Sequence, residues 1–264
     1  MDKKLCILKT NLKKFGSVLV AYSGGVDSTL LVKVAKDTLP ADKVLAVTGS
    51  SVFYPDSEIE FARETAKKLS VKHIVIKGNP LNNPKIYSNP KDRCYWCKSD
   101  LFSQLALIAK KNNLRYIVDG TNFDDIKDFR PGIKACAEYN VRSPLKDAKL
   151  SKKGIRLLSK QYGLPTWDKP AFPCFASRFP YGDTLTKHNL KMVELAEKYL
   201  LDLGLKEVRV RHHNNIARIE LRDKDIKLFL AINIRKQVVK KLKSLGYTYV
   251  TLDIEGYRTG SMNI

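Results

Sequence analysis

The chain has no apolar run long enough to cross a lipid bilayer. Its first six residues are basic, but no apolar signal-peptide core follows them, so we expect a cytoplasmic protein without a membrane partner. Five cysteines in 264 residues are too few for a disulfide scaffold, and their clustering favours metal or redox chemistry. With 44% hydrophobic and 28% charged residues, the sequence is of ordinary globular type, with room for one large or two small domains.

Acidic residues are also few, because 27 Asp and Glu face 48 Lys and Arg and leave a formal net charge of +21. One interpretation is a nucleic-acid surface, most plausibly for tRNA. The other interpretation of the net charge is that the proteins of the source organism are rich in lysine in general and that the ligands of this protein are small molecules with phosphate groups. The basic residues are spread along the whole chain, and the densest patch, 236–243, has the period of a solvated helix face. The charge is therefore compatible with tRNA as a partner but does not favour it.

Strands and helices alternate in the first half of the chain. The apolar patterns predict strands at 17–22, 44–48, 73–76 and 116–120, and helices that begin near 30, 56 and 98. A polar segment with three prolines, 78–93, predicts a long loop. This order implies an α/β fold, in which helices cover both faces of a parallel sheet. Ligands bind at the carboxyl ends of such strands, which here carry Ser23, Thr48, Gly49 and Gly120.

The second half changes in character after Pro165. Four prolines interrupt the stretch up to residue 180, which excludes a regular helix or a central strand there. Beyond it the patterns predict a helix at 189–203, a hairpin of 207–211 and 216–221 that turns at Asn214 and Asn215, a helix at 226–245 and a strand at 247–254. We therefore expect a smaller C-terminal α+β domain. The predicted division is 1–182 and 183–264.

The stretch Ser23–Thr29, with the sequence S-G-G-V-D-S-T, follows the first predicted strand and precedes a helix. Two glycines let the backbone adopt positive φ and approach a ligand closely. The N–H groups and dipole of the helix N-terminus then attract an anion, most obviously a phosphate chain. Hydroxyl donors come from Ser23, Ser28 and Thr29, and the Asp27 carboxylate could hold Mg²⁺ or cap the helix. The alternative to a phosphate-binding loop is an ordinary glycine-rich turn with a purely structural role.

The spacing and the lysine of the Walker A loop are missing. The stretch instead resembles the PP-loop, S-G-G-x-D-S, of the ATP pyrophosphatase superfamily, which has an adenine nucleotide alpha hydrolase-like fold. This resemblance implies ATP and Mg²⁺ as cofactors and cleavage of ATP between its α- and β-phosphates. It implies a catalytic role for Asp27. It also implies that ATP is bound by Ser23, Gly24, Gly25, Asp27, Ser28 and Thr29, together with Thr48 and Gly120.

The cysteines form a second candidate site. Cys94 and Cys97 make a C-x-x-C pair that fits half of a zinc site, a redox pair or part of an iron–sulfur site. Cys6 and Cys136 lie in helix-like apolar settings and are expected to be packed thiols. Cys174 lies in a kinked segment beside a serine and an arginine, where it is either a buried loop cysteine or a reactive thiolate.

The motifs taken together resemble the LarE family of ATP-dependent sulfur transferases. The matching segments cover nearly the whole chain and are 23–28, 93–98, 119–122, 130–132, 174–182, 209–211, 217–220 and 255–263. The resemblance implies biosynthesis of the nickel-pincer nucleotide, the lactate racemase cofactor. ATP would activate each carboxylate of pyridinium-3,5-biscarboxylic acid mononucleotide as an acyl-adenylate. Sulfur would then replace oxygen, with release of AMP and pyrophosphate.

The resemblance also implies two sources for the sulfur. In one variant of the family the cysteine that matches Cys174 gives up its own sulfur and becomes dehydroalanine. In the other, cysteines that match Cys94, Cys97 and Cys174 hold a [4Fe-4S] cluster whose fourth iron carries a hydrosulfide. This chain has all three cysteines, which favours the cluster variant with sulfide or a persulfide as donor. The family further suggests a homo-oligomer.

Arginines in the Cys174 segment and in the predicted hairpin suit the phosphate and carboxylates of such a substrate. Besides Cys174 and Asp27, Arg178 is predicted to be catalytic, and the predicted substrate-binding residues are Ser177, Arg178, Arg209, Arg211, Arg218 and Glu220. A purely structural alternative for Arg218 and Glu220 is a cross-strand ion pair at the surface. His212 and His213 are expected to be exposed hairpin residues.

Two rival functions share part of these features. A tRNA thiolation enzyme also has a PP-loop, three cysteines and a basic surface, but would usually carry an RNA-binding element such as zinc knuckles. A non-catalytic iron–sulfur or zinc protein could use ATP only as a conformational ligand. The intact PP-loop, and Cys174 beside Arg178, argue against this last interpretation.

Overall fold

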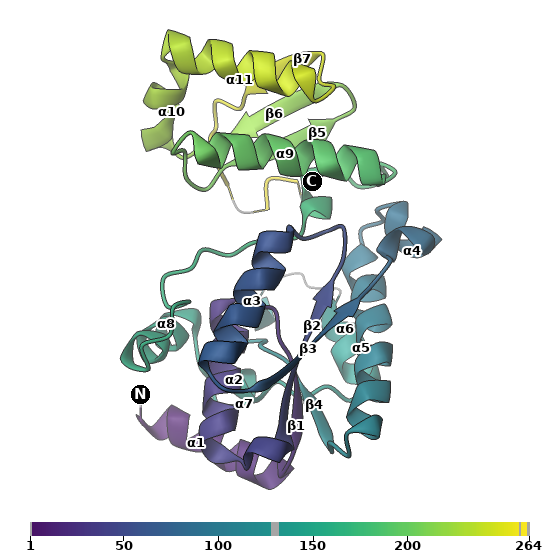
Figure 1. The fold of residues 1–264 in the computed structure, drawn as a ribbon, viewed down its shortest axis with the longest axis vertical. Helices are drawn as coiled ribbons and strands as arrows, with labels where there is room; N and C mark the ends of the chain where they lie inside the picture. Colours follow the sequence, from purple (N-terminus) through teal and green to yellow (C-terminus); the bar gives the residue numbers. More distant parts are fainter. Residues whose placement is uncertain (1, 128–131, 259, 263–264) are drawn as a thin grey trace. The chain divides into compact units, whose positions relative to one another are not determined.

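The protein is described by a computed structural model that covers residues 2–127, 132–258 and 260–262 (Figure 1). The chain folds into two compact units. The first unit is Met1–Asn79 with Asp92–Phe172, and the second is Pro80–Lys91 with Pro173–Ile264. These units differ from the predicted division, because residues 80–91 and 173–182 pack with the C-terminal part.

Hydrogen bonds explain why the short segment 80–91 joins the second unit. The Asn89 side-chain amide donates to the carbonyl of Pro180 at 2.6 Å, and the Asn89 carbonyl accepts from the Gly182 amide at 3.0 Å. The Leu185 amide donates to the carbonyl of Tyr87 at 2.7 Å. Asn89 is fully buried, so these bonds satisfy polar groups that water cannot reach.

The first unit is built on a parallel sheet with the strand order β3-β2-β1-β4. Its strands are β1 (Val18–Ala21), β2 (Val44–Ser50), β3 (Lys72–Lys77) and β4 (Tyr116–Val118). The central strand β1 pairs with β2 through Val18 and Val44, and with β4 through Val18 and Tyr116. The sheet confirms the predicted α/β class and all four predicted strands.

Helices cover both faces of this sheet, as Figure 1 shows. Side chains alternate along β1, so that Val18 and Val20 pack into one apolar core while Leu19 packs into another. The first core contains residues from α1 (Asp2–Phe15), α2 (Val26–Thr38), α3 (Asp56–Lys68), α7 (Pro144–Asp147) and α8 (Lys152–Gln161). The second contains residues from α5 (Arg93–Lys111) and α6 (Gly132–Glu138).

The structure differs from the predicted helices at several points. The helix α5 begins at Arg93 rather than near residue 98, so the C-x-x-C pair lies inside its first turns. The predicted loop 78–93 contains the short helices η2 (Pro80–Asn82) and α4 (Pro84–Tyr87). Prolines at the first position of short helices are compatible with helix, because that N–H has no intrahelical partner. None of the helices in the described residues is long and apolar enough to span a membrane.

The second unit is a small α+β layer structure. Its sheet has the order β5-β6-β7, with β5 (Arg209–His213), β6 (Ile216–Glu220) and β7 (Tyr249–Leu252). The antiparallel β5–β6 hairpin turns at Asn214, whose φ is 54°, as predicted. One long helix was expected before β7, and this expectation is wrong. The chain forms α10 (Asp223–Leu230) and α11 (Ile232–Ser244), because Ala231 adopts an extended ψ of 132°.

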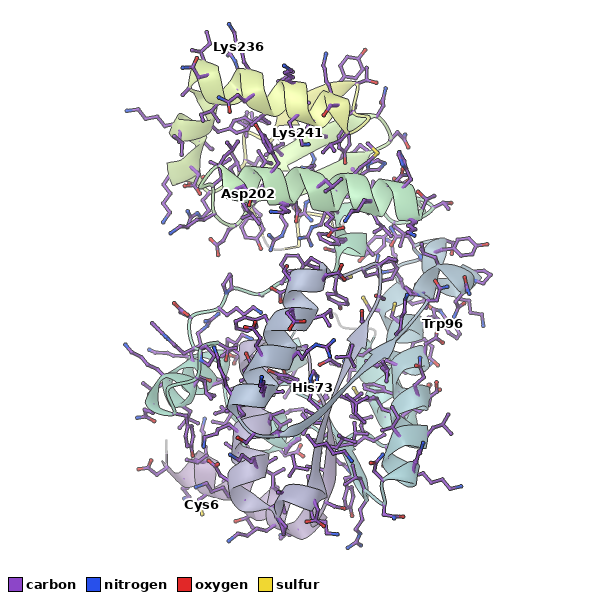
Figure 2. The ribbon with its side chains drawn as sticks, viewed as in Figure 1. Cys6, His73, Trp96, Asp202, Lys236 and Lys241 are labelled. Carbon is purple, nitrogen blue, oxygen red and sulfur yellow. The ribbon has the colours of Figure 1, made fainter. Side chains whose placement is uncertain are left out.

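One face of this second sheet is apolar and the other is charged. Val210, Ala217 and Ile219 pack with residues of α11 and of α9 (Lys187–Asp202) in a single apolar core. His212 shares that face by alternation and is buried against Phe179 and Tyr247, so the expectation of an exposed residue is wrong. The basic patch at 236–243 lies on α11, and Lys236 and Lys241 can be followed in Figure 2.

Candidate functional site

The turn before α2 depends on a single left-handed residue. Gly24 has a φ of 71°, and a Cβ atom placed there would lie 2.9 Å from the Cβ atom of Ala62 in α3. Gly25 has a φ of −82°, so the expectation that both glycines need positive φ is wrong for Gly25. Only glycine therefore combines this backbone angle with this close packing at position 24.

The hydroxyl groups of this turn have different surroundings. Ser23 is exposed, and its Oγ lies 3.0 Å from Oγ of the buried Ser28. The Ser28 hydroxyl in turn donates to the carbonyl of Gly25 at 3.2 Å. Thr29 is fully buried and donates to the Tyr22 hydroxyl at 3.5 Å. Ser23 is thus the accessible hydroxyl of the three, while the other two hold the turn together.

A second glycine lets another segment approach the α2 N-terminus. A Cβ atom at Gly120 would lie 3.0 Å from the backbone nitrogen of Ser28 and 3.4 Å from Cβ of Asp27. The four N–H groups of the first helical turn have no intrahelical acceptor. The turn that follows β4 therefore packs directly against the part of α2 that can bind an anion.

Asp27 lies between two segments that are distant in the sequence. Its Oδ1 accepts from the Asn122 amide at 3.5 Å, and its Oδ2 is ion-paired with Lys152, the first residue of α8. Burial raises the pKa of the Asp27 carboxyl, and the Lys152 ammonium group opposes that rise. The carboxylate oxygens of Asp27 are hard donors that suit Mg²⁺. Asn122 faces Asp27 with its amide nitrogen, because its Oδ1 accepts from the Asp124 amide at 2.9 Å.

The sequence offered little signal for two of these residues. Asn122 was part of a matched motif without an assigned role, and Lys152 was not singled out at all. Both come to Asp27 only through the sheet topology, because α8 follows β4 by more than thirty residues. The turn that carries Asn122 is fixed by Asp119, which accepts from the Thr121 amide at 3.2 Å and from Ser143 Oγ at 2.7 Å.

Thr48 lies at the carboxyl end of its strand as predicted, but its hydroxyl serves the fold. It donates to the carbonyl of Tyr22 at 2.7 Å and lies 2.8 Å from Nε2 of His73. Because the Thr48 hydrogen goes to Tyr22, Nε2 of His73 is the donor in the second bond. A role for Thr48 in ATP binding stays a prediction.

The cysteines divide into accessible and packed thiols. Cys94 is exposed, and Cys97 and Cys174 are partly exposed. Cys136 is buried as expected, and burial, together with nearby Asp119, raises the pKa of its thiol to about 11. Cys6 was expected to be packed, and this is wrong, because it lies on the exposed face of α1 (Figure 2). Within the described residues, no group of three His, Cys, Asp or Glu side chains could hold a metal ion.

Arg178 is fully buried in the second unit, and its contacts there are extensive. Nε and Nη2 donate to the two carboxylate oxygens of Glu197, each at 2.9 Å. Nη1 donates to the carbonyl of Pro173 at 2.8 Å and to Ser177 Oγ at 2.9 Å. Glu197 also accepts from the Val210 amide at 2.9 Å. Arg178 thus ties the Cys174 segment to α9 and β5, which is the geometry of a positioning residue.

The charged face of the β5–β6 hairpin is also buried. Arg211 Nη2 donates to Glu220 at 2.6 Å and to Ser261 Oγ at 2.8 Å, while Nη1 donates to the carbonyl of Ser177 at 3.0 Å. Nε of Arg211 is buried without a hydrogen-bond partner in the described part of the chain. Glu220 is fully buried, so the interpretation of a surface ion pair with Arg218 is wrong.

Arg218 and Arg209 complete this face. Arg218 is ion-paired with Asp253 and lies 3.4 Å from Glu220, and its Nε lies 3.2 Å from Nε2 of His213. Arg209 donates to the carbonyl of Val208 at 2.7 Å and stacks on Tyr257. Burial lowers the pKa of Arg209, and the nearby Arg178 charge adds to that shift. Arg178, Arg211 and Arg218 are ion-paired with Glu197, Glu220 and Asp253, so carboxylates of the same unit offset most of the positive charge of these arginines.

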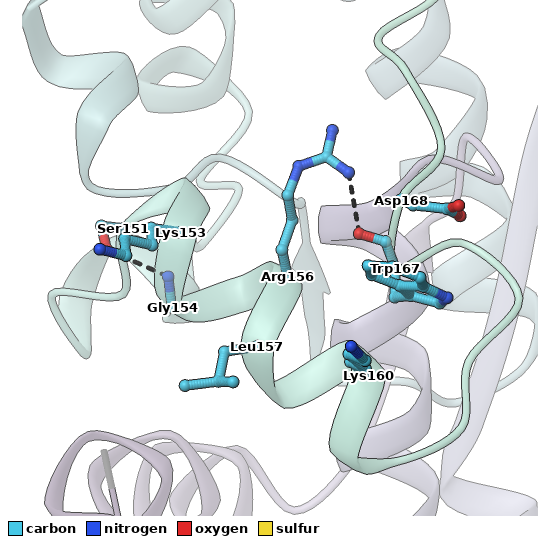
Figure 3. Close-up of a pocket in the computed structure, with 8 residues that line it drawn as sticks. All are labelled: Ser151, Lys153, Gly154, Arg156, Leu157, Lys160, Trp167 and Asp168. Atoms are coloured by element: carbon cyan, nitrogen blue, oxygen red, sulfur yellow. Dashed lines mark hydrogen bonds between the residues drawn. The ribbon is translucent and has the colours of Figure 1, made fainter.

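Four residues of the matched motifs lie outside the described residues: Arg130, Pro131, Thr259 and Asn263. A groove of about 540 Å³ runs along α8 in the first unit. Figure 3 shows Arg156 donating to the carbonyl of Trp167 there, at 2.8 Å. None of the predicted site residues lines this groove.

Comparison with known proteins extends the motif evidence to the whole chain. A family model described as NAD synthase matches residues 3–90. The pyridinium-3,5-bisthiocarboxylic acid mononucleotide synthase of Lactiplantibacillus plantarum is 43% identical over 98% of this chain and 94% of its own length. The chain belongs to the LarE family. It is therefore an ATP-dependent sulfur transferase, and membership of the ATP-utilising PP-loop family implies ATP and Mg²⁺.

Two further relatives of this LarE-family enzyme carry no assigned activity in their names. An uncharacterized protein of Synechocystis is 43% identical over 100% of the chain and 98% of its own length. An uncharacterized protein of Methanocaldococcus jannaschii is 34% identical over 97% of the chain and 98% of its own length. All three similarities span both compact units, so the family assignment rests on much more than the PP-loop.

The close approach of Gly120 to α2 gives a direct test of the ATP site. We expect Gly120→Ala to lower ATP–pyrophosphate exchange roughly tenfold or more, because the new methyl group would push the Ser28 nitrogen and misplace the helix N-terminus. Gly78→Ala is the matched control, since its Cβ atom would meet only the Ser50 carbonyl oxygen at an ordinary 3.7 Å. Equal exchange rates in the two variants would contradict the role given to Gly120.

Proposed function

We propose that this enzyme makes pyridinium-3,5-bisthiocarboxylic acid mononucleotide from the corresponding biscarboxylic acid, as a step of nickel-pincer nucleotide biosynthesis. The observation that carries the proposal is the 43% identity to a synthase of that name over nearly the full length of both chains. The second unit is compatible with it, because a dicarboxylate mononucleotide carries three anionic groups and this unit contains Arg178, Arg209, Arg211 and Arg218, whose guanidinium groups suit phosphate and carboxylates.

The first half of the proposed reaction is adenylation. A carboxylate oxygen of the substrate attacks the α-phosphorus of ATP, the bond to the bridging oxygen breaks, and pyrophosphate leaves. The N–H groups of the α2 N-terminus stabilise the charge on the phosphates, and Ser23 adds an accessible hydroxyl. The carboxylate oxygens of Asp27 would hold Mg²⁺, which would offset the negative charge of the phosphates, and the Asn122 amide nitrogen donates to that carboxylate and orients it.

The second half is replacement of oxygen by sulfur. The acyl-adenylate is a mixed anhydride, so a sulfur nucleophile forms the C–S bond while the C–O bond to AMP breaks. We assign substrate binding to Ser177, Arg209, Arg211, Arg218 and Glu220, and in place of the predicted direct contact we assign Arg178 a positioning role. Among these, Arg211 is the strongest candidate for direct contact, because its buried Nε has a hydrogen to donate and no partner in the described residues. Arg178 acts on the reaction by fixing Ser177 and the Cys174 segment.

For the sulfur source, we propose a [4Fe-4S] cluster held by Cys94, Cys97 and Cys174. Thiolates are the usual ligands of such clusters, and these three cysteines of the matched motifs are at least partly exposed, whereas Cys136 is buried. A cluster with one iron left free of thiolate would supply a binding position for hydrosulfide. The alternative within the same activity is that Cys174 donates its own sulfur and ends as dehydroalanine.

A tRNA thiolation activity is the second candidate, supported by the net charge of +21 and by the PP-loop. It ranks lower, because the identity to the mononucleotide synthase spans the whole chain. We further propose that the enzyme works in the cytoplasm as a homo-oligomer, with sulfide or a persulfide as the donor.

Exchange of labelled pyrophosphate into ATP separates the two candidates. We expect exchange to depend on the dicarboxylate mononucleotide, because only a bound carboxylate can make the adenylation reversible in the absence of sulfur. Unmodified bulk tRNA in place of the mononucleotide should leave the rate at its background value. Exchange that requires tRNA and ignores the mononucleotide would overturn the proposed substrate.

Anaerobic reconstitution tests the proposed cluster. We expect about four iron atoms per wild-type chain, and a loss of most of that iron in Cys174→Ala, because the proposed cluster would lose one of its three thiolate ligands. Cys136→Ala is the matched control and should retain its iron. Absence of iron in the wild type, together with a loss of H₂S mass from Cys174 after turnover, would instead establish the sacrificial route.

A further inference from the structure

The Lys152 side chain extends to the N-terminal end of α2, and hydrogen bonds hold its backbone in place at the start of α8. Its backbone amide donates to Asp124 at 2.8 Å, and the preceding Ser151 caps α8 by accepting from the Gly154 amide at 3.3 Å. The Lys152 side chain is 37% exposed and ends at Oδ2 of Asp27. A flexible stem on a fixed backbone can move its ammonium group over a few ångströms without disturbing α8.

The contribution of the Lys152–Asp27 ion pair to folding stability does not by itself explain a lysine at position 152. A partly exposed ion pair contributes only about 0–1 kcal/mol to folding. The Asp27 carboxylate is the more buried partner, and Lys152 is its only ion-pair partner within the described residues. The Asn122 side chain, which also donates to this carboxylate at 3.5 Å, is a neutral amide. Asp27 therefore depends on Lys152 for compensation of its charge as long as nothing else is bound.

We propose that Lys152 is an exchangeable counter-ion, which neutralises Asp27 in the nucleotide-free enzyme and moves to the phosphate chain when MgATP binds. The inference rests on the use of MgATP at the α2 N-terminus. A magnesium ion and an ammonium group compete for the same carboxylate oxygen, because each would repel the other there. Once displaced, the ammonium group is still within a stem length of the helix N-terminus, where it meets the negative charge of the phosphates.

This exchange predicts opposite effects on two ligands. In Lys152→Met we expect Mn²⁺ alone, used as the probe for Mg²⁺, to bind about tenfold tighter, because the competing cation is gone. Mg²⁺ with α,β-methylene ATP should bind roughly tenfold more weakly, because a charged hydrogen bond to phosphate is lost. Isothermal titration measures both affinities on the full chain, beside Lys153→Met as the matched control on the same helix.

The opposite signs make the inference easy to overturn. Weaker binding of both ligands, unchanged binding of either, or equal effects in Lys153→Met would each contradict it. Lys152→Gln, which keeps a polar side chain, should repeat both effects if Lys152→Met folds poorly. The wild type reports separately on the function, since failure of wild-type enzyme to bind the MgATP analogue would overturn the ATP site itself.

Discussion

The ATP site that we propose for this LarE-family enzyme depends on the close packing of two backbone segments. The turn after β4 lies against the first turn of α2, with room at Gly120 for a hydrogen atom and for nothing larger without a shift of Ser28. Gly24 provides a second close approach, between the PP-loop and α3. These approaches gather the N–H groups of the first turn of α2, Asp27 and Asn122 at one end of the parallel sheet. Removal of either glycine would change the positions of all of them together.

The second unit is characterised by buried ion pairs. Arg178 and Glu197 form a bidentate pair that is almost completely inaccessible to water, and Arg211 with Glu220 forms another buried pair. Breaking such a pair leaves an unpaired buried charge, which costs about 3–5 kcal/mol. Positively charged groups are therefore held in place before any substrate arrives. In the substrate site that we propose, the carboxylates of Glu197 and Glu220 thus fix the orientation of the arginines.

Local signals in the sequence predicted the four parallel strands, the PP-loop and the β5–β6 hairpin. Each of these depends on alternation, apolar runs or turn residues within about ten positions. The pairing of Lys152 with Asp27 could not be predicted in this way, since the two residues are brought together by the order of the strands. The burial of His212 was missed because its polarity outweighed the strand alternation that places it beside Tyr247.

The most direct test of the proposed chemistry follows oxygen atoms. The substrate is prepared with ¹⁸O in both carboxylates and is incubated with the enzyme, MgATP and the sulfur donor. If sulfur enters through an acyl-adenylate, each AMP released carries one ¹⁸O atom in its phosphate, because the attacking carboxylate oxygen leaves with AMP. Mass spectrometry of AMP measures this directly. AMP without ¹⁸O beside a thiocarboxylate product would contradict the account.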